Sequence, residues 1–199
     1  MKQITFALLL GCVVVLTMGT GTYGRSDAFK ENIYDPGPLK PNDSALKVRV
    51  GEQAPEFSLP AVSGEQVSLS QFRGKKNVVI SFVPAAWTPV CSDQWPGYNI
   101  VEDLFEQHDA VLIGITVDNI PSLFAWTRQM GKLWFPVLSD FWPHGAVADR
   151  YGVLRSDGMS ERALFVIDRE GVIQYIDVHD INQRPRLEIL IGELEKLSR

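Results

Sequence analysis

One cysteine of the chain, Cys91, stands among residues that could make its thiol reactive. It lies in the stretch from Ser81 to Trp95, SFVPAAWTPVCSDQW. Thr88 and Pro89 carry two helix-start signals, since threonine is a good N-cap and proline suits the first helical position. Cys91 would then be the third helical residue, where the helix dipole stabilises a thiolate, the nucleophilic form of cysteine. The alternative is a buried and inert cysteine.

Two buried strands and the helix between them must position this cysteine. Continuous apolar runs over 77–84 and 110–117 predict strands that are buried on both faces. Apolar residues recur between the runs at helical spacing: Tyr98, Val101, Leu104 and Phe105. Strand, helix and strand together predict a βαβ unit with a parallel sheet. Cys91 follows the first strand, at the junction where α/β folds place their sites.

The remaining pattern predicts a mixed β-sheet with helices on both faces. A small hairpin is expected within 56–72 around Ser63-Gly64, and a second over 162–178 around a turn at 169–171. Apolar stripes near 120–127 and 187–194 predict two more helices. Helices that alternate with strands, followed by an antiparallel hairpin, are typical of an α/β domain.

The composition predicts one globular domain and argues against several functions. The chain has 199 residues, of which 45% are hydrophobic and 22% charged. Its net charge of −5 gives no basic excess, so nucleic-acid binding is not expected. The chain has only two cysteines, which cannot form a disulfide scaffold. No group of cysteines and histidines has the sequence spacing that is typical of zinc ligands. We therefore expect neither a metal ion nor a cofactor.

The amino terminus predicts export from the cytoplasm. An apolar run of 18 residues from Ile4 to Gly21 follows Lys2. Its length lies between the ~7–15 residues of a signal peptide and the ~20 of a membrane-spanning helix. We expect residues 1–21 to be a signal peptide or, preferably, a membrane anchor, with lipidation at Cys12 left open. The domain would be extracytoplasmic and held at the membrane through residues 4–21; the alternative is cleavage and a periplasmic or secreted protein.

Residues 22–49 have the composition of a tether. The segment is polar, contains Pro36, Pro38 and Pro41, and shows neither helical nor strand periodicity. The predicted organisation is therefore an export segment over 1–21, a Pro-rich tether over 22–49 and a single domain over 50–199.

The residues around Cys91 also resemble a known family. Pro84, Thr88 and Cys91 match the P-x-x-x-[TS]-x-x-C signature of peroxiredoxins. The chain is similar to the alkyl hydroperoxide reductase/thiol-specific antioxidant group, nearest its one-cysteine and bacterioferritin-comigratory-like members. The resemblance runs from Val50 to Leu197 and includes GEQAPEFSLP, FRGKKNVVISFVP, FPVLSD and RALFVIDREGVI in the expected order. It implies a thioredoxin-like fold and the reduction of hydrogen peroxide and organic hydroperoxides through a cysteine sulfenic acid.

The resemblance also implies roles for individual residues. Cys91 would be the peroxidatic nucleophile, and Thr88 would hydrogen-bond the peroxide and the sulfur. Pro84 would shield the thiolate and shape the pocket. Arg162, at the start of a late strand, would supply the cation that stabilises the thiolate and holds the peroxide oxygens. The implied partners are a peroxide substrate and an external thiol reductant, either a thioredoxin-like protein or a small thiol; a homodimer is left open.

The sequence departs from the family pattern at several positions. Gln94 stands where relatives often have glutamate, and Trp87 where they often have phenylalanine or tyrosine, while Trp95 has only a packing rationale. No second cysteine lies within the domain, because Cys12 belongs to the export segment. We therefore expect a one-cysteine mechanism in which an external thiol reduces the sulfenic acid of Cys91.

Other functions of the same fold require residues that this chain lacks. A thiol–disulfide oxidoreductase needs C-x-x-C, and a copper-delivery module needs two cysteines and a histidine. A membrane-tethered docking or redox module without peroxidase turnover remains the alternative.

Overall fold

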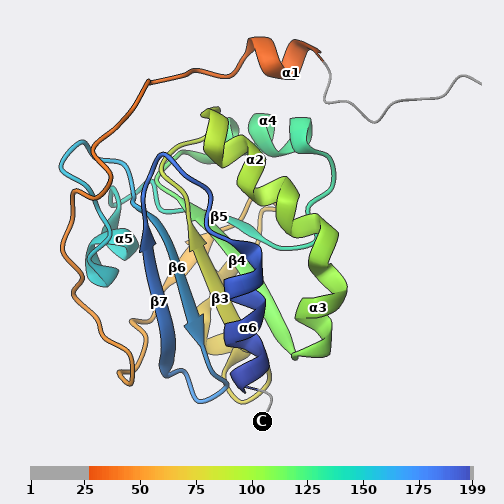
Figure 1. Ribbon diagram of the computed structural model, residues 1–199, viewed down its shortest axis with the longest axis vertical. Coiled ribbons are helices and arrows are strands. Elements are labelled where there is room, and N and C mark those ends of the chain that lie inside the picture. Colours follow the sequence, from red (N-terminus) through yellow and green to blue (C-terminus); the bar gives the residue numbers. More distant parts are fainter. Residues whose placement is uncertain (1–26, 198–199) are drawn as a thin grey trace, which may run out of the picture.

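The computed structural model describes residues 27–197 (Figure 1). The predictions for residues 1–21 and for Cys12 fall outside this range. Within it, no helix combines the length and the apolar character that crossing a membrane would require.

A five-stranded mixed sheet forms the centre of the domain, in the order β5-β4-β3-β6-β7. β3 (Asn77–Phe82) and β4 (Ala110–Thr116) are parallel, as the two apolar runs predicted, and β5 (Val137–Ser139) is parallel to β4. β6 (Arg162–Ile167) pairs antiparallel with β3 and with β7 (Ile173–His179), which confirms the late hairpin.

The sheet separates two hydrophobic cores, and β3 contributes to both. Val78, Ile80 and Phe82 face one core, whereas Val79 and Val83 belong to the other. Successive side chains of a strand point to opposite faces, so a strand with a core on each side must be apolar throughout. This explains the continuous apolar run in the sequence.

Helices cover both faces of the sheet (Figure 1). One face carries α2 (Pro89–Tyr98), α3 (Glu102–Gln107), α4 (Ile120–Met130) and α6 (Leu187–Leu197). The other carries α5 (Ala146–Tyr151) and the predicted hairpin, made of β1 (Ser58–Pro60) and β2 (Gln66–Ser68) and followed by the 3₁₀ turn η1 (Leu69–Phe72). The α/β fold with a mixed sheet between helices is thus confirmed.

The helix predicted between β3 and β4 is divided into two. The short 3₁₀ turn η2 (Asn99–Val101) separates α2 from α3. Pro96 and Gly97 lie in the last part of α2, and both residue types are unfavourable inside a helix. The division leaves α2 as a separate ten-residue helix that begins next to the end of β3.

The described part of the 22–49 segment lies against the domain. After α1 (Asp27–Glu31), residues 32–47, here called the strap, pass along the side of the domain that carries α5 (Figure 1). Phe29 is buried and its ring lies 6.0 Å from that of Trp87. Further along, the Lys47 backbone N–H donates to the Tyr151 carbonyl. The composition of the segment predicted a tether; these contacts with the domain were not predicted.

Polar groups fix the middle of the strap. The Asp43 backbone N–H donates to the buried carboxylate of Glu161 at 2.5 Å, and Glu161 forms an ion pair with Arg155 at 2.7 Å. The Asp43 carboxylate accepts hydrogen bonds from Lys40 and from Ser156. These hydrogen bonds, the one from Lys40 first, hold the pKa of Asp43 well below its usual range. The strap is therefore attached by specific bonds as well as by packing.

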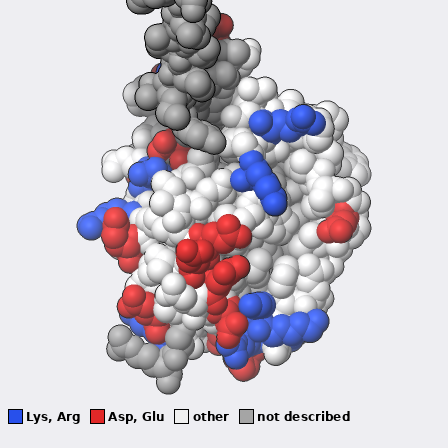
Figure 2. Space-filling model, turned by 90° about the vertical axis from the view of Figure 1, so that its right-hand side faces the viewer, with Lys and Arg blue, Asp and Glu red and all other residues white. Residues whose placement is uncertain are grey.

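Charged side chains of both signs are interspersed on the face shown in Figure 2. Acidic side chains gather near the middle of this view, and lysine and arginine side chains lie towards its lower edge and upper right. This mixture agrees with a chain that has 19 basic and 24 acidic residues.

Candidate active site

Cys91 occupies the position that the sequence predicted for it. α2 begins at Pro89, and Thr88 is the N-cap residue with an extended backbone. Cys91 is therefore the third residue of the helix, and its side chain is fully buried. The start of the helix lies close to the carboxyl end of β3, where the positive end of the helix dipole favours an anion.

The Thr88 side chain does not cap the helix. Its hydroxyl donates instead to the carbonyl oxygen of Ala85 at 2.9 Å. A hydroxyl oxygen has two lone pairs, so Oγ1 can still accept a hydrogen bond from another donor. The predicted N-cap position is thus confirmed, whereas the hydrogen bond expected of an N-cap side chain is absent from the described residues.

Arg162 is brought to Cys91 across the sheet, from the start of β6. Its side chain is 1% exposed, and Nη2 lies 3.4 Å from the Cys91 sulfur. Nε and Nη2 also donate to the Ile181 carbonyl at 3.1 and 3.0 Å, and Nη1 donates to Oε1 of Gln94 at 2.5 Å. These bonds fix the guanidinium plane from two sides.

The charge of this guanidinium has no acidic partner among residues 27–197. Arg162 forms no ion pair there, and the buried carboxylate next to it in sequence, Glu161, is paired with Arg155. A buried cation is costly unless an anion lies beside it. The charge of Arg162 therefore faces the Cys91 sulfur with no carboxylate beside it among the described residues.

Gln94 turns its carbonyl oxygen towards Arg162 because its amide nitrogen is used elsewhere. Nε2 donates to the Tyr98 hydroxyl at 3.0 Å and lies 3.3 Å from the Ser81 hydroxyl. Burial raises the pKa of Tyr98 to about 12, so its phenol stays neutral at physiological pH. The neutral amide therefore holds the guanidinium without neutralising it.

A pocket of about 520 Å³ opens above this cluster. Pro84, Thr88 and Arg162 line it, and Arg162 contacts the sulfur of the buried Cys91. All four residues that the sequence singled out are therefore brought together at one place. The other side of the pocket is made by the strap, from Tyr34 to Leu39.

Contacts from outside the motif hold the loop between β3 and α2. The Asp118 carboxylate, just after β4, accepts a hydrogen bond from the Ala86 N–H at 2.8 Å. Trp87 has a φ of 61°, a left-handed conformation that is rare for a bulky residue, and its carbonyl accepts from the Tyr34 N–H at 2.8 Å. Asp118 and Tyr34 were not predicted from the sequence. A carboxylate at the end of a buried strand could have indicated Asp118, but no signal pointed to Tyr34.

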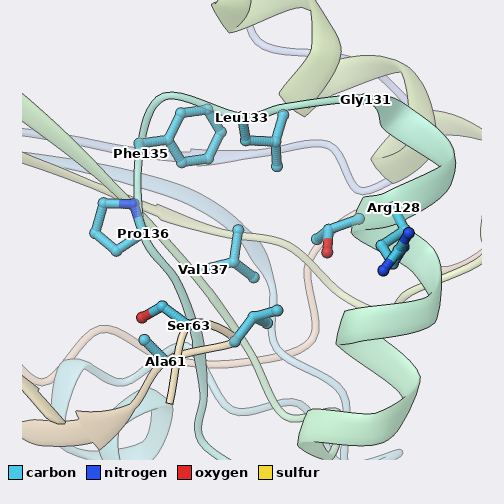
Figure 3. A pocket seen from close by; sticks show the side chains of 10 residues that line it. Ala61, Ser63, Arg128, Gly131, Leu133, Phe135, Pro136 and Val137 are labelled. Atoms are coloured by element: carbon cyan, nitrogen blue, oxygen red, sulfur yellow. The ribbon is translucent and has the colours of Figure 1, made fainter. Parts of the chain in front are cut away.

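A second hollow, shown in Figure 3, has no comparable chemistry. It measures about 220 Å³ and lies between the end of α4, the start of β5 and the loop after β1. No cysteine, histidine or carboxylate lines it. Its polar groups have other contacts: the Thr127 hydroxyl donates to the Leu123 carbonyl, and the Arg128 guanidinium lies over the Phe124 ring. In the described part of the chain, no group of three or more potential metal ligands occurs.

Comparisons with known proteins agree with the geometry. Residues 50–176 match the model of the AhpC/TSA family. Alkyl hydroperoxide reductase E of Mycobacterium tuberculosis is 38% identical over 132 residues, which cover 66% of this chain and 86% of that protein. A chloroplastic 2-cysteine peroxiredoxin of Chattonella marina var. antiqua is 32% identical over 146 residues, which cover 69% and 74%.

Solved structures show the same fold. The reduced 2-Cys peroxiredoxin of Plasmodium vivax has a TM-score of 0.69 at 28% identity, covering 74% of this chain and 81% of that one. Mycobacterium tuberculosis AhpC has a TM-score of 0.69 at 24% identity, covering 75% and 93%, a likeness that shows the fold alone. The thioredoxin-like fold is thus confirmed, and the chain belongs to the AhpC/TSA family.

Proposed function

We propose that this protein is a thiol-dependent peroxidase that reduces hydrogen peroxide and organic hydroperoxides with Cys91 as its nucleophile. The observation that carries the proposal is the contact of 3.4 Å between Arg162 Nη2 and the Cys91 sulfur. A buried guanidinium in contact with the sulfur, at the start of a helix, places positive charge where negative charge develops during attack on a peroxide. Membership of the family, whose relatives are named alkyl hydroperoxide reductase and peroxiredoxin, supports the same activity.

The proposed reaction begins with attack of the Cys91 thiolate on one oxygen of the peroxide. A sulfur–oxygen bond forms, the oxygen–oxygen bond breaks, and the leaving oxygen takes up a proton to become water or an alcohol. The sulfur is oxidised by two electrons to a sulfenic acid. Arg162 stabilises the negative charge that develops on the leaving oxygen, Thr88 Oγ1 accepts a hydrogen bond that orients the peroxide, and Pro84 keeps water from that side of the sulfur.

An external thiol then restores the cysteine. It attacks the sulfenic sulfur and releases water to give a mixed disulfide, which a second thiol reduces. The one-cysteine character of this cycle rests on the sequence, which has no cysteine other than Cys91 from residue 50 to the end. A relative that is named for two cysteines is also among the matches, so the subtype is part of the proposal.

The test is peroxide consumption by the full-length chain with an added thiol. Cys91→Ser is expected to abolish turnover while the circular-dichroism spectrum stays that of the parent. Cys12→Ser, the matched control, removes the other cysteine and is expected to leave turnover unchanged. Equal turnover in the parent and in Cys91→Ser would refute the proposal. If the parent itself consumed no peroxide, a docking module without turnover, which no observation favours at present, would replace it.

A further inference from the structure

The strap forms one wall of the pocket above Cys91, although it lies outside the residues that match the family. We propose that this wall determines specificity: the strap makes a site for the apolar tail of an organic hydroperoxide, so that such substrates react faster than hydrogen peroxide. The inference rests on the proposed peroxidase function and adds the residues that select the substrate.

The size of the pocket exceeds what hydrogen peroxide needs. Two oxygen atoms occupy on the order of 50 Å³, judged from the ~30 Å³ of a water molecule. The pocket measures about 520 Å³, which is within the range of sites for larger organic ligands. Most of its volume is therefore available to a part of the substrate that does not react.

The surface of the pocket is mainly apolar away from the reactive end. Pro36, Pro38 and Leu39 contribute from the strap, and Met159 and Ile181 from the domain. The transfer of hydrocarbon from water to such a surface is favourable, because it lowers the free energy. The Asp35 carboxylate also lines the strap side, and it disfavours a tail that carries negative charge. The chemistry of the wall thus fits a neutral alkyl chain.

The strap is held in place at both ends of the wall, so the site is already formed. The Asn182 side chain accepts from the Leu39 N–H and donates to the Leu39 carbonyl, both at 2.8 Å. At the other end, the Tyr34 N–H donates to the Trp87 carbonyl at 2.8 Å. A preformed wall spares the substrate the entropic cost of ordering it, so tail binding can contribute to the rate.

The reactive and apolar parts of the pocket are continuous. Thr88 and Arg162 line the same cavity as Leu39, and Arg162 contacts the Cys91 sulfur. A hydroperoxide whose O–O bond lies at Arg162 can therefore extend its tail along the wall that Leu39 and its neighbours form. Contacts with the tail hold the O–O bond at the sulfur, which raises the rate of attack.

The experiment measures the second-order rate constant of Cys91 oxidation in the full-length chain. The substrates are hydrogen peroxide and a series of linear alkyl hydroperoxides with two to eight carbons. In the parent, the rate constant is expected to rise by up to about fourfold for each buried methylene and then to level off when the pocket is full. Leu39→Ser is expected to flatten this rise, so that the rate constants with the longer alkyl hydroperoxides fall towards the one with hydrogen peroxide.

Leu46→Ser is the matched control, because Leu46 is an exposed leucine of the same strap that does not line the pocket. It should behave like the parent. Tyr34→Ser, at a pocket residue that is 71% exposed and whose backbone N–H the substitution keeps, should flatten the rise in part. The inference is overturned if the parent shows no rise, if Leu39→Ser keeps the full rise, or if Leu39→Ser slows hydrogen peroxide equally. An inactive parent would instead refute the peroxidase function itself.

Discussion

The Arg162 guanidinium connects three segments of the site: its own strand β6, the helix α2 and the loop after β7. It contacts the Cys91 sulfur, the Gln94 carbonyl oxygen and the Ile181 carbonyl, which belong to α2 and to the loop after β7. Neutral acceptors hold its orientation and leave its charge uncompensated. This combination makes the cation available both to the thiolate before the reaction and to the leaving oxygen during it.

The first prediction concerns this cation. Arg162→Ala is expected to lower the rate of Cys91 oxidation by hydrogen peroxide by roughly 10²–10³, the usual loss for one electrostatic group that stabilises a transition state. The measurement is stopped-flow oxidation of the reduced protein.

Arg162→Lys provides the control, because it retains the charge and loses the planar set of donors. It should recover part of the lost rate. Thermal unfolding of both variants shows whether the loss comes from the site or from the fold. If Arg162→Ala remained folded and reacted at the parent's rate, Arg162 would have no part in the reaction.

At the scale of elements, α2 is fixed to the sheet by a tryptophan against a glycine. Trp95 is fully buried, and its indole N–H donates to the Ser81 hydroxyl on β3 at 3.2 Å. A Cβ atom at Gly114 on β4 would lie 2.7 Å from the Trp95 ring. The glycine therefore lets the helix that carries Cys91 approach the sheet closely, and the packing role expected of Trp95 is confirmed.

The second prediction follows from this close approach. Gly114→Ala is expected to lower the free energy of unfolding by about 1–3 kcal/mol, because the added methyl group overpacks the Trp95 ring. Urea denaturation measures the change. Gly192→Ala on α6 is the control: a Cβ there meets no atom within 4 Å, and alanine favours a helix, so this variant should be as stable as the parent or more so. Equal stability of Gly114→Ala and the parent would show that the ring moves without cost.

In the whole molecule, oxidation by peroxide can involve either of the two cysteines, Cys91 and Cys12. The third prediction is that the full-length protein, treated with one equivalent of peroxide, holds a sulfenic acid or a mixed disulfide and no internal bridge. The other cysteine, Cys12, belongs to the predicted export segment and is separated from the domain by the predicted tether over 22–49. A disulfide needs Cα atoms within about 7 Å, so we expect no bridge between Cys12 and Cys91. Intact mass should therefore show a gain of one oxygen, or of one captured thiol, while excess peroxide without thiol should produce sulfinic acid.

Two outcomes would contradict the one-cysteine cycle. Loss of two hydrogens from the monomer, mapped to Cys12 and Cys91, would show an internal bridge. A covalent dimer through two copies of Cys91 would show resolution between chains. The Cys12→Ser variant separates the two, because it can form only the dimer.

The fourth prediction is the cellular address. The apolar run from Ile4 to Gly21 predicts that the domain is exported and held at the membrane, or released after cleavage. Fractionation of the source cells should find the chain with the membranes or outside the cytoplasm. A full-length chain in the cytoplasmic fraction would contradict this prediction.

Much of the fold and part of the site could be predicted from the sequence. The apolar runs over 77–84 and 110–117 became β3 and β4, and Thr88-Pro89 marked the start of α2 with Cys91 as its third residue. These features depend on local preferences and on apolar periodicity, which are written in consecutive residues. The resemblance of the late strand to the family added Arg162, whose place in the chain alone does not indicate a contact with Cys91.

Only the tertiary structure decided which distant segments complete the site. Arg162 reaches Gln94 and Cys91 across separations of 68 and 71 residues, and Leu39 meets Asn182 across 143. The strap has no periodicity because it is held by backbone groups bonded to distant partners and by a few separate apolar contacts, and neither leaves a pattern in consecutive residues. The sequence therefore determined the reactive cysteine and the elements that carry it. Packing between distant segments determined which cation faces the sulfur and which wall the substrate meets.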